Sequence, residues 1–203
     1  MNPQTLSTSL SRVIVKHSPE FKRKEDHIRY GLEWTISGIL QISTILIVAT
    51  VLGILVESLV FLFVGMILRS TAGGIHFKKH MYCYIYSTLS VIGLAFISKL
   101  FIFNVWSEPY VFIGLVSTGL FITFIRAPRL YVKKKCFTTK QKAQYKYISM
   151  LLFISFSYVS WIMVDVSIKQ VIQLALMHQI FVLTNIGEYT FIFTEKILGG
   201  NIK

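Results

Sequence analysis

The sequence contains few charged residues, and most of them are of one sign. Only 15% of its 203 residues are charged, whereas 54% are hydrophobic. Soluble domains carry about 25% charged and roughly 45–50% apolar residues, so this composition argues against an ordinary soluble protein. The apolar residues also gather in long runs, which the core of a soluble domain does not require. The sequence therefore predicts an integral membrane protein.

Several other features are scarce. The two cysteines fall in segments expected to be cytosolic or close to the membrane, where reducing conditions disfavour a structural disulfide. The N-terminus lacks the apolar core and small-residue cleavage site of a secretory signal peptide. No glycine-rich stretch leads into a Lys-Ser or Lys-Thr pair, which excludes a phosphate-binding loop. No repeat or soluble domain is visible, so we expect one membrane domain over residues 1–203.

The apolar runs divide into about six expected membrane-spanning helices. A span needs roughly 20 apolar residues. The run 31–68 is too long for one span and fits a helical hairpin with a tight turn near Gly53 to Glu57. Four further candidates are 82–103, 109–125, 147–164 and 170–194. The last contains several polar residues, which leaves five spans as the alternative. The expected fold class is an all-α membrane protein.

Lysine and arginine lie in segments that six spans would place on one side of the membrane. These segments are the N-terminal stretch 1–30, the loops 69–81 and 126–146, and the end of segment 147–203. The hairpins 31–68 and 82–125 have short outer turns with few cations. Because positively charged loops stay in the cytoplasm, both termini and the loop 69–81 are expected there.

The net charge of +12 follows from these same segments. A cation near an anionic membrane surface gains about 1 kcal/mol of attraction. The basic residues are split between spans and form no nucleic-acid motif, so the sequence indicates anionic lipids and not nucleic acid as a partner. Residues 5–16 fit an amphipathic helix on the inner membrane surface, with one apolar side. That side is made of Leu6, Leu10, Val13 and Ile14.

The reactive side chains gather in RSTAGGIHFKKHMYC, residues 69–83, between the second and third spans. Gly73-Gly74 allows a backbone turn that other residues disfavour. Cys83 falls near the start of the third span, in a segment rich in cations. Such surroundings, with a histidine nearby, favour a thiolate nucleophile and supply a base that later acts as an acid. The segment predicts a nucleophilic cysteine.

Two histidines compete for the role of base. On a continuous helix His80 would lie beside Cys83, because residues three apart are neighbours. His76 would lie about 10 Å away along such a helix, and would reach the thiol only if residues 73–80 fold back. Local spacing favours His80 slightly and leaves both open. Two histidines and a cysteine lack a fourth ligand, so no metal or other cofactor is expected.

The order of these residues is similar to that found in a known family. Arg69, Gly73-Gly74, His76 and Cys83, in this order between the second and third of six short spans, resemble the accessory gene regulator B (AgrB) family. Its members are bacterial membrane cysteine endopeptidases that process a quorum-sensing propeptide. The resemblance implies that His76 and Cys83 are the catalytic pair. It places Arg69, Gly73 and Gly74 in supporting positions.

The resemblance extends to Ala127-Pro128 and the following lysine-rich loop. It implies that Cys83 attacks a carbonyl near the C-terminal part of a small AgrD-like propeptide and forms an acyl-enzyme. A thiol or hydroxyl of the peptide then closes a thiolactone or lactone ring. The implied location is the bacterial cell membrane, with the catalytic loop facing the cytoplasm. A homodimer is compatible with the resemblance.

The remaining polar residues are weaker candidates. Lys133, Lys134 and Lys135 are expected to determine topology and are candidate contacts for an acidic propeptide tail. Cys136 follows them without a histidine nearby, and we interpret it as an incidental surface cysteine. Lys99 is expected to extend towards the outer interface.

A polar stripe in the last apolar run supports an alternative function. His178, Asn185 and Glu188 are seven and then three residues apart, so one continuous helix would carry them on one face. Ionisable groups at membrane depth usually face the protein interior and often mark function. The stripe is either a packing seam or the lining of a substrate cavity, with Glu188 as a candidate contact.

Two functions from other classes remain open. A non-catalytic transporter or export component for a peptide would use the polar stripe as its path. A membrane scaffold would bind a peptide through the basic loops. Only the endopeptidase requires Cys83 and His76 to act as a coupled pair.

Overall fold

The computed structural model describes residues 3–75, 77, 80–101, 108–129 and 137–197. These residues are almost entirely helical, and they contain no strand, only an isolated bridge between Gly73 and Arg129. The all-α fold class is confirmed. The contacts divide the chain into two compact units, residues 1–48 and 49–203, and each unit is described by itself.

The first unit contains a short helix, a 3₁₀ turn and most of a long helix. These are α1 (Pro3–His17), η1 (Pro19–Lys24) and α2 (Glu25–Val51). The helix expected at residues 5–16 is present as α1. Leu10, Val13 and Ile14 are exposed on it, whereas Ser7 and Ser11 are buried. That α1 lies on a membrane surface stays a prediction.

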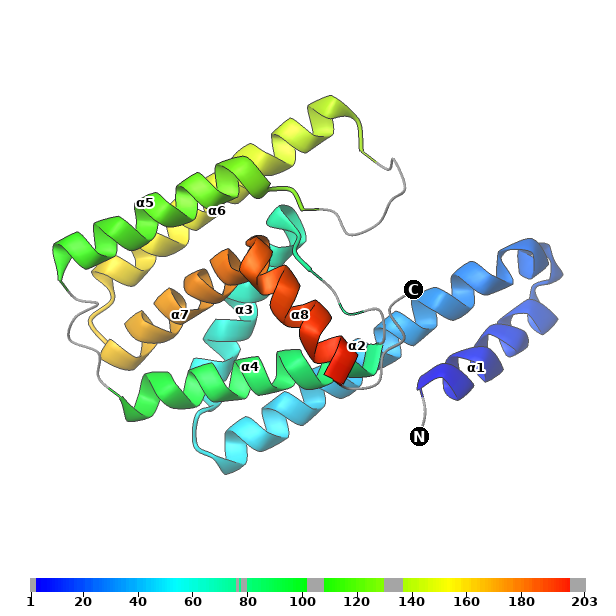
Figure 1. Ribbon diagram of the computed structural model, residues 1–203. Coiled ribbons are helices and arrows are strands. Elements are labelled where there is room, and N and C mark those ends of the chain that lie inside the picture. The colour runs from blue at the N-terminus through cyan, green and yellow to red at the C-terminus, as the bar shows by residue number, and fades with distance from the viewer. Residues whose placement is uncertain (1–2, 76, 78–79, 102–107, 130–136, 198–203) are drawn as a thin grey trace. The chain divides into compact units, whose positions relative to one another are not determined.

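The second unit is a helical bundle built around α7, as Figure 1 shows. Its elements are α3 (Leu55–Ala72), α4 (His80–Leu100), α5 (Pro109–Arg126), α6 (Thr139–Ile162), α7 (Val166–Leu183) and α8 (Asn185–Ile197). Helices α3, α4, α5 and α6 all pack against α7, which contains the continuous buried run 170–176. A helix that is buried on all sides suits the centre of a bundle.

Five helices among the described residues are long and apolar enough to cross a membrane. They cover 19–51, 55–72, 81–100, 109–126 and 166–183. The span expected at 147–164 falls mostly within α6, whose early turns carry Lys140, Lys142 and Lys146. Helix α6 begins with a capping box in which Thr138 and Gln141 exchange hydrogen bonds. The cytoplasmic location of both termini stays a prediction.

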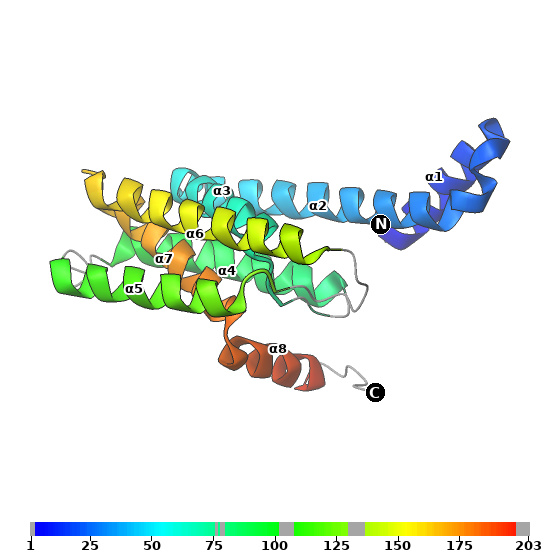
Figure 2. The ribbon, with the colours of Figure 1, turned by 90° about the horizontal axis from the view of Figure 1, so that it is seen from above.

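The prediction of one continuous span over residues 170–194 was wrong, because the helix breaks in the middle of this segment. Helix α7 ends at Leu183, Thr184 is extended, and α8 begins at Asn185. The Thr184 hydroxyl lies 2.8 Å from the Phe181 carbonyl and 3.2 Å from the Gly187 N–H, so it caps the new helix. Figure 2 shows α8 leaving the end of α7 and lying at the edge of the bundle. His178, Asn185 and Glu188 therefore do not share one helical face.

The turn expected near Gly53 to Glu57 is confirmed. Helix α2 ends at Val51 and α3 begins at Leu55, with Gly53 at a φ of 67°. Lys99, expected to extend towards the outer interface, has partners in this turn. Its ammonium group donates to the Gly53 carbonyl and lies 3.7 Å from the buried Glu57 carboxylate. This ion pair links the start of α3 to the end of α4.

The turn between α6 and α7 joins the same polar cluster. The Ser167 hydroxyl lies 3.1 Å from the Glu57 carboxylate and 3.0 Å from that of Asp165. Asp165 caps α7 by accepting the Ile168 N–H at 3.0 Å. This bond, and then the Ser167 hydroxyl, lower the pKa of Asp165. The cluster closes the end of the bundle opposite the Gly73-Gly74 turn.

Candidate functional site

The site begins where α3 ends, at two glycines with positive φ. Gly73 has a φ of 73° and caps the helix with a 3.0 Å bond from its N–H to the Arg69 carbonyl. Gly74 has a φ of 151°. A Cβ at Gly73 would collide with the Arg129 carbonyl, and one at Gly74 would lie 2.7 Å from the Val182 side chain. Both positions require glycine for conformation and for space.

The segment that follows α5, residues 127–129, holds this turn in place and is called the strap below. Arg129 donates its N–H to the Ala72 carbonyl at 2.9 Å and accepts the Gly74 N–H at 3.1 Å. The buried Gln179 side chain of α7 donates to the Gly73 carbonyl at 3.0 Å. Backbone groups that leave a helix need such partners. The turn is thus fixed by segments that lie far along the sequence.

The guanidinium of Arg129 extends the strap to the corner between α7 and α8. Its Nη1 atom donates to the carbonyls of Leu183 and Thr184, both at 2.9 Å. Its Nη2 atom forms an ion pair with Glu188. A cation is favourable at the carbonyl end of a helix. Glu188, a candidate substrate contact in the sequence, is an ion-pair partner of Arg129 in the structure.

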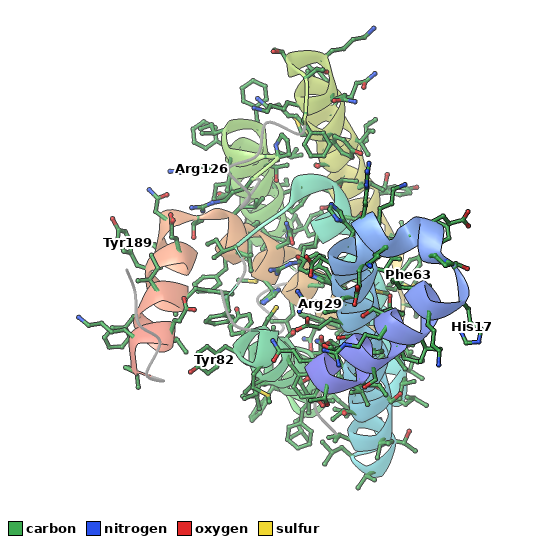
Figure 3. The ribbon with its side chains drawn as sticks, turned by 90° about the vertical axis from the view of Figure 1, so that its right-hand side faces the viewer. His17, Arg29, Phe63, Tyr82, Arg126 and Tyr189 are labelled. Carbon is green, nitrogen blue, oxygen red and sulfur yellow. The ribbon has the colours of Figure 1, made fainter. Side chains whose placement is uncertain are left out.

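The remaining member of the predicted polar stripe has a partner elsewhere. Asn185, at the start of α8, accepts a 2.8 Å hydrogen bond from Arg126 at the end of α5. Figure 3 shows Arg126 at that end of α5, and Tyr189 on the side of α8 that points away from the bundle. Residues 178, 185 and 188 thus take part in three separate interactions and do not line one path.

Arg69 links the glycine turn to the candidate nucleophile. Its guanidinium donates to the Ile75 carbonyl, two residues after Gly73. The same group interacts electrostatically with the side chains of Cys83 and Tyr86 on α4 and of His178 on α7. The structure therefore brings Arg69, the Gly73-Gly74 turn and Cys83 close together.

Cys83 is half-buried in the first turns of α4, against an aromatic cluster. The cluster is built from Ile75, Phe77, Val182 and Phe191, with Tyr82, Cys83, Tyr86 and Phe181 packed around it. Phe77 stacks on Phe191 of α8 with ring centroids 4.5 Å apart. Figure 3 shows Tyr82 at the start of α4. These apolar groups limit the access of water to the thiol.

Several predicted site residues lie outside the described part of the chain. His76 is one of them, as are Lys133, Lys134, Lys135 and Cys136. The structure describes His80 only through its backbone, at the first residue of α4. The choice between His76 and His80 as the base therefore stays a prediction.

Sequence reasoning missed a polar pair beside the thiol. The Tyr86 hydroxyl lies 3.1 Å from Nε2 of His178, and the two rings stack with centroids 5.9 Å apart. The His178 ring also contacts Phe61 of α3, with centroids 5.7 Å apart. A local signal existed, because Tyr86 follows Cys83 by three residues and must share its side of α4. No local signal connects α4 to His178.

Sequence reasoning also missed the roles of Arg129 and Gln179. In the sequence, Arg129 is one of several cations in a basic loop, and Gln179 is a single polar residue in an apolar run. Among the described residues, no group of three His, Cys, Asp or Glu side chains could hold a metal ion.

An apolar hollow lies between α5 and α7. It has a volume of about 460 Å³ and shares Phe181 with the surroundings of Cys83. Its other lining residues include Phe112, Leu115, Met177 and Ile180. It contains none of the residues of the Arg69–Cys83 motif.

Comparison with known proteins places the chain in a family. The sequence profile of the family described as accessory gene regulator B matches residues 7–183. An AgrB-like protein of Clostridium perfringens strain SM101 is 28% identical over 96% of this chain and 99% of its own length. AgrB-like protein 2 of Clostridium perfringens strain 13 is 33% identical over 61% of this chain and 59% of its own length.

No solved structure matches the chain. The profile covers most of the sequence, including the Arg69–Cys83 motif, the strap and helix α7. The protein belongs to the accessory gene regulator B (AgrB) family.

Proposed function

We propose that this protein is a membrane-embedded cysteine endopeptidase that cleaves a small AgrD-like propeptide and promotes its cyclisation for quorum sensing. The observation that carries the proposal is the position of Cys83. It lies at the start of a membrane-spanning helix, close to the charge of Arg69 and against the aromatic cluster. The cation and the helix N-terminus favour the thiolate, whereas burial against the apolar cluster opposes it, so the proposal requires a histidine that takes the thiol proton.

The proposed reaction has two acyl transfers. His76 takes the thiol proton as Cys83 attacks a carbonyl of the propeptide, and a carbon–sulfur bond forms. The peptide C–N bond breaks, and His76 returns the proton to the leaving amine. A thiol or hydroxyl of the bound peptide then attacks the thioester. The bond to Cys83 breaks, its sulfur regains a proton, and a thiolactone or lactone is released.

The second transfer needs protection from water, because hydrolysis would release a linear peptide. Phe77 and Phe191 stack beside the thiol and supply apolar cover. Exclusion of water prevents such side reactions in closed active sites. The Gly73-Gly74 turn, held by Arg129 and Gln179, positions the segment that leads to His76. A cytoplasmic location for this turn is part of the proposal.

The transporter alternative loses its main support. It depended on one helix carrying His178, Asn185 and Glu188 as a continuous polar path. The break at Thr184 separates these residues. Their partners lie in three different places: Tyr86 in α4, Arg126 in α5 and Arg129 in the strap.

The reactivity of Cys83 tests the proposal without a propeptide. The protein, with Cys136→Ser, is reconstituted in nanodiscs and alkylated with iodoacetamide over a range of pH. We expect Cys83 to react faster at neutral pH than a free cysteine, and His76→Ala to remove this advantage while His80→Ala preserves it. If His80→Ala alone removes the advantage, the base is His80. A thiol no more reactive than free cysteine in all variants would contradict the proposal.

A further inference from the structure

We propose that Tyr86 is a catalytic hydrogen-bond donor, whose hydroxyl group, held by His178, stabilises the oxyanion formed when Cys83 attacks a carbonyl. This inference rests on the proposed endopeptidase function and adds a residue to its machinery. The tetrahedral intermediate of acyl transfer carries a negative oxygen, and enzymes place hydrogen-bond donors where that charge develops. The Arg69–Cys83 motif by itself identifies no such donor.

The position of Tyr86 relative to the thiol is the first argument. Tyr86 follows Cys83 by three residues on α4, so the two side chains are neighbours on one side of the helix. Both pack against the same cluster of Ile75, Phe77, Val182 and Phe191. Their side chains also interact electrostatically with each other and with Arg69. The hydroxyl is thus close to the site where a bound carbonyl would react.

The orientation of the hydroxyl is the second argument. Nε2 of His178 lies 3.1 Å from the Tyr86 oxygen. In the tautomer that carries its proton on Nε2, His178 donates to this oxygen. The hydroxyl proton of Tyr86 then remains available to an oxyanion at Cys83. His178 is accordingly a positioning residue, because it acts through Tyr86 and does not touch the substrate.

The packing around the pair fixes its geometry. The Tyr86 ring lies 4.4 Å from that of Phe191 and 5.7 Å from that of Phe77, measured between centroids. His178 is held between Tyr86 and Phe61. A donor that is fixed before the reaction needs no reorganisation when the charge forms, and the apolar surroundings strengthen the interaction.

Two reagents separate this role from a purely structural one. Iodoacetamide alkylates a thiolate by displacement at carbon, and no oxyanion forms. p-Nitrophenyl hexanoate acylates the same thiol through a tetrahedral oxyanion. The Cys83 sulfur bonds to the carbonyl carbon, the ester C–O bond breaks, and p-nitrophenolate leaves. The ratio of the two rates therefore reports on oxyanion stabilisation, whereas a change in folding or thiol access alters both rates.

The experiment uses the full chain with Cys136→Ser in nanodiscs. We expect Tyr86→Phe to lower the acylation rate about tenfold or more, towards the roughly 100-fold cost of losing an oxyanion donor. The alkylation rate should change less than about twofold. Tyr82→Phe is the matched control, because Tyr82 is also a tyrosine of α4 packed against the same cluster. It should leave the ratio of rates unchanged.

Variants of His178 test the positioning role. His178→Leu removes the group that holds Tyr86 and should lower acylation selectively, whereas His178→Gln retains a donor and should restore part of the rate. A Tyr86→Phe variant with an unchanged ratio would overturn the inference while leaving the endopeptidase proposal intact. If Cys83 of the parent protein reacts with neither reagent faster than free cysteine, both proposals fail.

Discussion

At the scale of single residues, Gly73 shows how one hydrogen in place of a methyl group decides the geometry of the site. Its φ of 73° is unfavourable for other residues, and the Arg129 carbonyl occupies the space of a Cβ. By contrast, a Cβ at Gly93 in α4 would have no atom within 4 Å. The sequence predicted a turn at Gly73-Gly74, but it did not predict that the backbone at Arg129 packs against this turn.

We predict that Gly73→Ala destabilises the second unit by about 1–3 kcal/mol, the cost of a strained backbone together with a displaced contact. The same change should slow alkylation of Cys83, because the bridge to Arg129 positions the segment leading to α4. Gly93→Ala is the control and should be neutral or slightly stabilising. Detergent-induced unfolding and iodoacetamide kinetics measure both effects. Equal behaviour of the two variants would contradict the steric argument.

At the scale of elements, the bundle is joined at its glycine-turn end by the strap after α5. Arg129 contacts the end of α3 through its backbone and the α7–α8 corner through its side chain. The sequence predicted the helices on either side of each junction. It could not predict the junction, because residues 129 and 188 are an ordinary cation and anion in sequence.

We predict that Arg129→Gln lowers the free energy of unfolding by about 2–3 kcal/mol, since it leaves the Leu183 and Thr184 carbonyls without their charged donor. Arg126→Gln is the matched control, because Arg126 is the last residue of α5 and precedes Arg129 by three residues. Arg126 is exposed and donates to the exposed Asn185 side chain, so its replacement should change the free energy of unfolding by no more than about 0.5 kcal/mol. Unfolding in mixed detergent micelles gives both values. A larger loss for Arg126→Gln would refute the assigned role of Arg129.

At the scale of the whole molecule, the distribution of cations predicts how the chain crosses the membrane. Glu108 precedes α5 at a turn with few cations, and Gln141 lies in the first turn of α6 beside Lys140 and Lys142. Because α5 is long and apolar enough to cross the bilayer, these two positions should face opposite sides. The positive charges predict that Gln141 faces the cytoplasm.

We predict that a membrane-impermeant maleimide labels Glu108→Cys, and not Gln141→Cys, in intact cells that lack Cys83 and Cys136 through serine substitution. Permeabilised cells serve as the control, and both positions should then react. Labelling of Gln141→Cys alone in intact cells would show that the topology is the reverse of the predicted one, with the glycine turn outside the cytoplasm. That result would also contradict the proposed access of a cytoplasmic propeptide to Cys83.

The sequence by itself determined the membrane class, most of the helices and the motif on which the proposed function rests. These depend on local composition: apolar runs of sufficient length, glycines at Gly53 and Gly73-Gly74, and the clustering of Arg69 and Cys83 in one segment. The tertiary structure decided the break at Thr184, the strap of Arg129 and the pairing of Tyr86 with His178. Each of these involves contacts between segments distant in sequence, and no periodic pattern within one segment encodes which distant partner will be met.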